Sequence, residues 1–229
     1  MKQSIIRHYF TKRIEDDAQD DKQFLNARVF RTVDRFLREK AGRSLSGALL
    51  DVGCGDGAFV KLCNGKGLKA HGVDIMDGID FESDPLEFPD ATFDIVTMFS
   101  VIEHLKDPSN ILTQVQRILK KDGLVVIITP NLYTTKFRFW DDPTHVKPYS
   151  PTNLPWLMNM FHFQKVALGL WTVDKSLLLW RLPESVQFFI GAHLPFTGLT
   201  KYVPRFLKGR STSILAIFRM GESRGTFSG

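Results

Sequence analysis

Apolar and polar residues alternate along this chain with two different periods. Up to about Lys40, a charged leader is followed by apolar residues at helical spacing, which predicts an amphipathic helix within residues 1–47. The apolar positions of this helix are Phe24, Leu25, Val29, Phe30, Val33, Phe36 and Leu37. From Ala48 onward, short apolar runs alternate with amphipathic segments, a pattern typical of strands that alternate with helices.

The middle of the chain predicts a β–α series. Strands are expected over Ala48–Val52, Lys69–Val73, Phe93–Phe99 and 124–129, and helices over 58–63 and from Asp107 and Pro108 to Gly123, with Ile111, Leu112, Val115, Ile118 and Leu119 on one face. This alternation favours an α/β fold, a Rossmann-like and mostly parallel sheet with helices on both faces. Only residues 75–89 separate the second strand from the third. A helix and a further strand would not fit there, so we expect a sheet trimmed at this point.

The last part of the chain has a different character. Final strands are expected over 165–173 and 214–220, so that residues 48–174 and 211–220 form one domain. The interval 175–210 is strongly apolar and too long for a hairpin loop, which predicts a helical cap inserted before the last strand. The tail, residues 221–229, is expected to be disordered.

Composition narrows the class of protein. The chain has 229 residues, enough for one domain with a lid, and a net charge of +5, which by itself does not indicate a DNA-binding protein. Its two cysteines make a disulfide framework improbable and suit a reducing cytosol, and no signal peptide or membrane span is recognisable. We therefore expect a cytoplasmic protein. With no second cysteine pair and with scattered aspartates, no metal site is expected.

The strongest functional motif is LLDVGCGDGAF, beginning at Leu49. Gly53 and Gly55 follow a strand and open a helix, as a nucleotide-binding turn requires, and the same residues fit a dinucleotide pattern. The carboxylates of Asp51 and Asp56 would repel a pyrophosphate, whereas they suit the sulfonium and ammonium groups of S-adenosylmethionine. Asp74 ends the next strand, where an acid accepts hydrogen bonds from ribose hydroxyls.

Together, LLDVGCGDGAF, GVDI, LEFPDATFDIVTMFSVIEHLKDP and LKKDGLVVIITPN resemble the class I S-adenosylmethionine-dependent methyltransferase family, in particular its small bacterial type 11/23-like group. The resemblance covers about Ala48 to Asn131. It implies that S-adenosylmethionine is the cofactor and S-adenosylhomocysteine the product. The residues that it implies at the cofactor are Asp51, Gly53 and Gly55 around the methionine part, Asp74 with Ile75 at the ribose, Asp80 with Phe81 at the adenine, and Phe99 with Ser100 beside the ribose and sulfur.

A weaker resemblance extends through DDPTHVKPYSP, which is similar to a segment of methyltransferases that act on sugars, polysaccharides and quinones. Its His145 is either the general base for an acceptor hydroxyl, since imidazoles titrate near neutral pH, or a residue that fixes the loop by a hydrogen bond. Glu103 and His104 mark the family, and a structural role is expected for them rather than a chemical one.

The resemblance thus implies a methyltransferase that acts on a hydroxyl of a small-molecule, sugar, glycan or lipid-linked acceptor. Two other readings stay open: methylation of tRNA or of a protein side chain, and a non-catalytic protein that only binds the cofactor. The apolar pieces of 175–210 with their basic flanks fit either peripheral contact with the inner face of the membrane, a homodimer interface, or closure over an apolar acceptor pocket.

Overall fold

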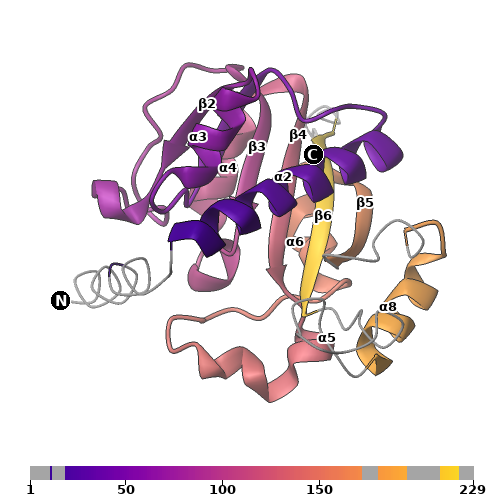
Figure 1. Cartoon of the computed structure of the whole chain (residues 1–229). Helices are drawn as coiled ribbons and strands as arrows, with labels where there is room; N and C mark the ends of the chain where they lie inside the picture. Colours follow the sequence, from indigo (N-terminus) through magenta and orange to yellow (C-terminus); the bar gives the residue numbers. More distant parts are fainter. Residues whose placement is uncertain (1–10, 12–18, 172–179, 195–211, 222–229) are drawn as a thin grey trace, which may run out of the picture.

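The fold is a six-stranded sheet covered on both faces by helices (Figure 1). The computed structural model describes residues 11, 19–171, 180–194 and 212–221. Its strands are β1 (Ala48–Val52), β2 (Lys69–Val73), β3 (Phe93–Phe99), β4 (Leu119–Pro130), β5 (Phe163–Trp171) and β6 (Ser213–Met220). Their order in the sheet is β2-β1-β3-β4-β6-β5, with β6 antiparallel to both of its neighbours and the other pairs parallel. The predicted mostly parallel Rossmann-like sheet is confirmed.

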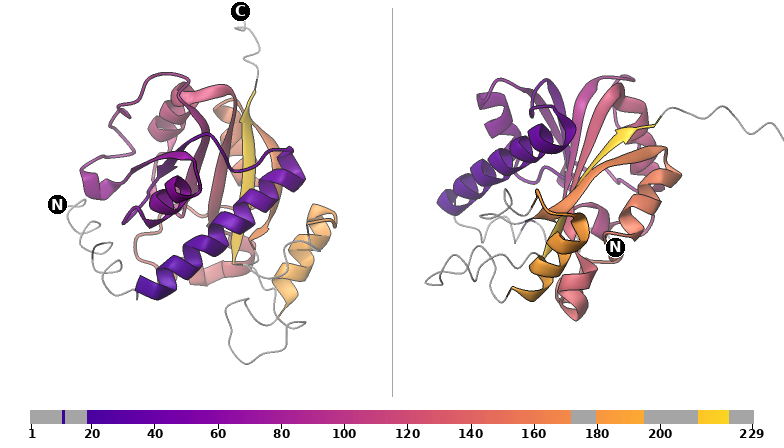
Figure 2. Two further views of the ribbon diagram at one scale, coloured as in Figure 1. Left: turned by 45° about the horizontal axis from the view of Figure 1, so that its top comes forward. Right: turned by 90° about the vertical axis from the view of Figure 1, so that its right-hand side faces the viewer.

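The helices divide into two layers (Figure 2). On one face, α2 (Gln19–Ala41) and α3 (Ala58–Gly65) pack on the sheet through residues that include Val33, Phe36 and Phe59. On the other face lie α4 (Ser109–Ile118) and α6 (Asn153–Met160). The other helical segments of the described residues are η1 (Ile75–Asp77), η2 (Ile102–His104), α5 (Leu132–Thr135), η3 (Lys136–Asp141) and α8 (Glu184–His193). Figure 1 shows α5 and α8 near the lower end of the sheet, where β4 ends.

The helix that precedes β4 ends earlier than the sequence pattern predicts. Gly123 does not close it, because α4 ends at Ile118 and residues from Leu119 onward belong to β4. Leu119 pairs with Phe93, and the register between β3 and β4 shifts directly after this pair. The pairing therefore draws Leu119 into the sheet, although its spacing continues the apolar face of α4.

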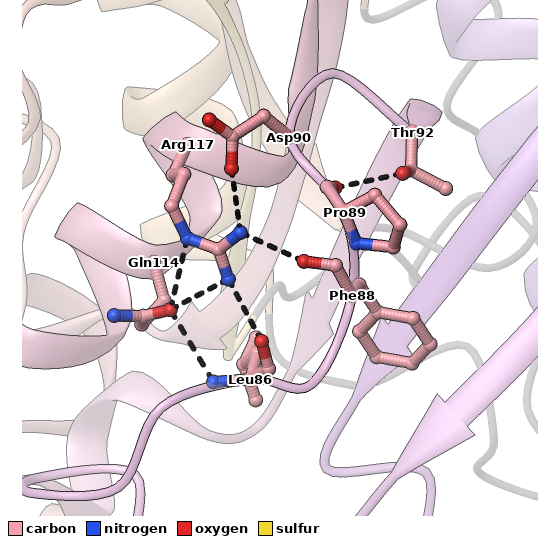
Figure 3. Close-up of polar contacts among 7 residues, drawn as sticks. All are labelled: Leu86, Phe88, Pro89, Asp90, Thr92, Gln114 and Arg117. Atoms are coloured by element: carbon pink, nitrogen blue, oxygen red, sulfur yellow. Dashed lines mark hydrogen bonds and ion pairs between the residues drawn. The ribbon is translucent and has the colours of Figure 1, made fainter.

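A single arginine holds the shortened link between β2 and β3. The Arg117 guanidinium donates to the carbonyl oxygens of Leu86 and Phe88, each at 2.7 Å, and to the carboxylate of Asp90 at 2.7 Å (Figure 3). Gln114 adds a bridge, because its Oε1 accepts from both Arg117 and the backbone N–H of Leu86. The link thus takes the place of a further strand and is fixed by side chains of α4.

The predicted cap is described only in part. Residues 180–194 contain α8, and Trp180 is buried against Phe36 of α2, with ring centroids 4.6 Å apart. The rest of the expected 175–210 cap, the charged leader apart from Thr11, and all but Gly221 of the expected disordered tail lie outside the described residues. Within the described part of the chain, no helix has the length and hydropathy that a membrane-crossing segment requires.

Candidate active site

The glycine turn follows β1 and is hydrogen-bonded to the last residue of β2. Gly53 and Gly55 have φ angles of 77° and 57°, values that residues other than glycine rarely adopt. The backbone N–H groups of Gly53 and Cys54 both donate to the carbonyl oxygen of Val73, at 2.8 and 3.2 Å. The turn therefore presents its backbone at the carboxyl ends of two adjacent parallel strands, where sheets of this type bind ligands.

Gly53 also leaves no room for a side chain. A Cβ atom built on it would lie 2.3 Å from Cγ2 of Val101, whereas one on Gly57, with a φ of 72°, would meet no atom within 4 Å. We expect Gly57→Ala to lower the free energy of unfolding by about 1 kcal/mol through backbone strain alone. Gly53→Ala should lower it by about 1–3 kcal/mol more, because it adds overpacking to the same strain.

Urea denaturation of both variants measures this difference. Adding Val101→Ala to Gly53→Ala should recover the overpacking part of the loss. Equal losses for Gly53→Ala and Gly57→Ala would show that Val101 does not close this turn.

Two buried carboxylates flank the turn. Asp51 is 3% exposed and accepts a hydrogen bond of 2.6 Å from Thr97 Oγ1. Burial, opposed by the hydrogen bond from Thr97 and reinforced by the nearby Asp74, raises the pKa of Asp51 to about 7. A cationic group bound beside Asp51 would stabilise its ionised form.

Asp74 connects the turn to the segment that follows β2. Its Oδ2 accepts from the N–H of Gly55 at 2.8 Å, and its Oδ1 accepts from the N–H of Met76 at 3.0 Å. Asp77 completes a capping box with it at η1. Each carboxylate oxygen can accept a second hydrogen bond, so these contacts leave capacity for ribose hydroxyls.

The other predicted cofactor residues occupy two different environments. Ile75, at the start of η1, and Phe99, at the end of β3, are both partly buried, and Ser100 follows Phe99 with a φ of 54°. Phe81, by contrast, is 6% exposed and packs in the core. Asp80, beside it, accepts from the N–H of Glu82. A role of Asp80 and Phe81 at the adenine stays a prediction.

His145 lies in the loop between η3 and α6 and is held on several sides. Its Nδ1 is 2.6 Å from the carbonyl oxygen of Phe139, and its ring stacks on the Phe139 ring. Its Nε2 is 4.0 Å from Oδ2 of Asp142, and its ring centroid is 4.9 Å from that of His104. The loop-fixing hydrogen bond considered for His145 is present, and it uses only one of the two ring nitrogens.

Glu103 connects this loop to the sheet. Its backbone oxygen accepts from the N–H groups of Val146 and Lys147, at 2.9 and 3.1 Å. Its side chain is fully buried, and its Oε2 accepts from Thr129 Oγ1 at 2.9 Å. Burial raises the pKa of Glu103 to about 7. These contacts attach the histidine loop to the end of the sheet that carries the glycine turn, and the structural role expected for Glu103 stays a prediction.

Comparison with known proteins identifies the family. The family model described as "Methyltransferase domain" matches residues 22–168, more than half of the chain. The chain belongs to this methyltransferase family. The predicted family and its Rossmann-like fold are thereby confirmed.

Relatives of this methyltransferase-family chain agree with the expected cofactor. A probable S-adenosylmethionine-dependent methyltransferase of Mycolicibacterium smegmatis is 28% identical over 119 residues, covering 46% of each chain. A ubiquinone biosynthesis O-methyltransferase of Pseudomonas entomophila is 30% identical over 109 residues, covering 38% of this chain and 47% of that protein. A SAM-dependent methyltransferase structure from Archaeoglobus fulgidus is 26% identical with a TM-score of 0.53, covering 86% of this chain and 98% of that one. The chain spans about half the length of the curated relatives that it matches.

The residues present fit the cofactor that these relatives name. A buried carboxylate with a raised pKa, Asp51, can receive the ammonium of the methionine part. The glycine turn presents its backbone at the ends of β1 and β2, where a ligand can approach closely. Asp74 offers free acceptor capacity where the ribose is expected. These groups lie at the carboxyl ends of two neighbouring strands, β1 and β2.

Other polar groups of the site were not recognised in the sequence. Thr97 and Thr129 lie inside apolar strands, where a threonine gives no signal of its own, and both reach buried carboxylates. Asp142 and Thr144 form a local turn whose side chains contact each other at 2.5 Å. The sequence Asp-Pro-Thr at 142–144 predicts a turn, but it does not predict the hydrogen bond between Thr144 and His104. A surface pocket of about 450 Å³ between α6 and β5 contains none of the predicted site residues.

Proposed function

We propose that this chain transfers a methyl group from S-adenosylmethionine to a hydroxyl group of a small-molecule, glycan or lipid-linked acceptor. The observation that carries the proposal is the attachment of the His145 loop to Glu103, directly beside the strand ends that form the cofactor turn. A base for the acceptor would then lie next to the methyl donor. The O-methyltransferase named among the relatives supports a hydroxyl acceptor.

The chemistry needs few groups from the protein. S-adenosylmethionine supplies a methyl group that its positive sulfur already activates. Asp51 and Asp74 would bind and orient the donor through its ammonium and ribose groups, and the turn at Gly53 would align it. Nε2 of His145 would take the acceptor's hydroxyl proton as the new C–O bond forms, while the S–C bonding electrons stay on sulfur. The reaction thus depends mainly on alignment and on one proton transfer.

Exposed aromatic side chains around the histidine loop support an acceptor with an apolar part. Tyr133, Phe137 and Trp140 are exposed by 53%, 90% and 54%, and all three precede His145 in α5 and η3. Such side chains on one short segment are typical of a surface that meets an apolar ligand. Lys136 and Arg138 lie among them and would suit acidic groups of the same acceptor.

A transfer assay with radiolabelled methyl donor tests the acceptor class. We expect incorporation into a catechol-like quinone precursor, a free sugar or a polyprenol-linked glycan, with no incorporation into tRNA or protein. Label found only in tRNA or protein would reject a small-molecule, glycan or lipid-linked acceptor. Cofactor binding without transfer to any substrate would favour the non-catalytic reading.

The cofactor assignment is tested at Asp74. Asp74→Ala should weaken binding of S-adenosylhomocysteine by roughly 1–3 kcal/mol, because ribose hydroxyls lose a charged acceptor. Asp74→Asn keeps one acceptor oxygen for the backbone N–H groups of Gly55 and Met76. Comparison of the two variants therefore separates the effect of the lost charge from that of the lost hydrogen bonds. Titration calorimetry measures both variants. Unchanged affinity in Asp74→Ala, or tight binding of NAD by the wild type, would contradict the assignment.

A further inference from the structure

Three side chains from two separate segments come together beside the cofactor turn. Glu103 and His104 belong to η2, and His145 lies in the loop after η3. One ligand atom from each lies within 4.8 Å of the others. Two imidazoles and one carboxylate form a donor set that suits Zn²⁺, Fe²⁺, Co²⁺ or Mn²⁺ better than Mg²⁺ or Ca²⁺, which prefer oxygen ligands.

Glu103 has an oxygen that the described part of the chain leaves without a hydrogen bond. Its side chain is fully buried and Oε2 accepts from Thr129, but Oε1 has no partner there. A buried carboxylate oxygen without a partner is costly, and a cation beside it would remove that cost.

Hydrogen bonds orient both imidazoles in the same way. The Thr144 hydroxyl donates to Asp142 Oδ1, so its oxygen is left to accept from Nδ1 of His104, 2.9 Å away. The carbonyl oxygen of Phe139 can only accept, so Nδ1 of His145 carries the proton in that contact of 2.6 Å. In each ring, Nε2 therefore holds the lone pair. Metal-binding histidines typically donate their other ring N–H to such outer partners.

We propose that Oε1 of Glu103 and the Nε2 atoms of His104 and His145 bind one divalent transition-metal ion. The histidine side of the site is partly exposed, so open positions on the ion would face the acceptor. This proposal departs from the expectation, drawn from the cysteines and scattered aspartates, that the chain holds no metal. The third ligand comes from a distant loop, and no local spacing could reveal it.

The site explains how a hydroxyl acceptor could be activated, and this use rests on the proposed function. An oxygen bound to such an ion loses its proton to solvent at a lower pH than a free hydroxyl does. With the ion bound, His145 is a ligand rather than the proton acceptor. Val101, two residues before Glu103, packs against Gly53 and so fixes the distance between the ion and the cofactor turn.

Cobalt binding tests the site without any methyl acceptor. Tag-free protein is stripped with a chelator and titrated with Co²⁺, whose visible absorption reports nitrogen ligands, and Zn²⁺ is then added as a competitor. We expect one Co²⁺ per chain, displaced by Zn²⁺. Glu103→Gln and His145→Ala should each weaken binding by about 100-fold or more.

His193→Ala is the matched control. Nδ1 of His193 also contacts a carbonyl oxygen, that of Phe189 at 2.7 Å, and its ring also stacks on that phenylalanine, but it lies on α8. Cobalt binding by His193→Ala should equal that of the wild type. Binding of S-adenosylhomocysteine shows that each variant is folded, and His104→Gln replaces any variant that fails this check.

Absence of Co²⁺ uptake by the wild type, or equal uptake by the wild type and His145→Ala, would overturn the proposal. Methyl transfer that is unaffected by the chelator would overturn the catalytic use of the ion. Cobalt binding in a protein that methylates only tRNA or protein would support the metal site and reject the small-molecule, glycan or lipid-linked acceptor, so the two proposals fail separately.

Discussion

His145→Ala is expected to lower kcat by about 10²–10⁴ with little change in cofactor affinity. The reason is its position: its Nδ1 contacts the carbonyl oxygen of Phe139, while its Nε2 is the nitrogen left for a proton or an ion. Both proposed roles of His145, as base and as ligand, act on the acceptor hydroxyl. Neither contributes to holding the methyl donor.

Steady-state kinetics with the acceptor from the transfer assay measure kcat. Calorimetry against S-adenosylhomocysteine measures the affinity for the cofactor product. His193→Ala provides the same loss of a stacked, carbonyl-bound imidazole elsewhere in the molecule and should leave kcat unchanged. Wild-type turnover by His145→Ala would leave only the loop-fixing role. A fall in cofactor affinity as large as the fall in kcat would show that the loop supports the donor site instead.

Ligand-free protein should lose stability as the pH rises from 5.5 to 7.5. In the folded state, burial raises the pKa of Asp51 from 3.8 to about 7 and that of Glu103 from 4.5 to about 7. Between the unfolded and folded values the folded protein binds more protons than the unfolded chain, so the free energy of unfolding decreases with pH. Over this interval each group contributes a loss of about 2 kcal/mol, and little further change is expected above it.

Urea denaturation at the two pH values measures the loss, and Asp51→Asn and Glu103→Gln should each remove about half of it. S-adenosylhomocysteine should restore the Asp51 part, because its ammonium stabilises the ionised carboxylate, so its affinity should rise with pH. A divalent ion should restore the Glu103 part. Stability that increases over this range would mean that these two carboxylates are already ionised in the ligand-free protein.

The regular elements of the fold follow closely from the apolar pattern. The bounds of β1, β2 and β3 agree with the predicted strands, because each strand is short and is followed directly by a turn residue. The pattern fails at Leu119, where helical spacing and strand pairing compete for one residue. The pattern also does not predict the hydrogen bonds of Arg117, because they depend on the path of the link after β2.

The two halves of the site differ in how far the sequence predicts them. The cofactor side rests on a glycine turn and on acids at strand ends, which are local features of Gly53, Asp51 and Asp74. The acceptor side rests on contacts across the fold. Glu103 meets Thr129 and the amides that follow His145 only after the sheet has formed, so sequence reasoning could name the residues but not their assembly.

The trimmed link has a consequence for the edge of the sheet. Among the strands that the structure describes, β2 is the outermost on its side, and outer strands can pair with other chains and start aggregates. Here the ring of Phe88 lies edge-on to His71 of β2, with centroids 6.0 Å apart, and the Arg117 guanidinium holds the Phe88 carbonyl in place. The link therefore packs on the face of this outer strand beside its open edge, in a position that Arg117 fixes while remaining remote from the chemistry of methyl transfer.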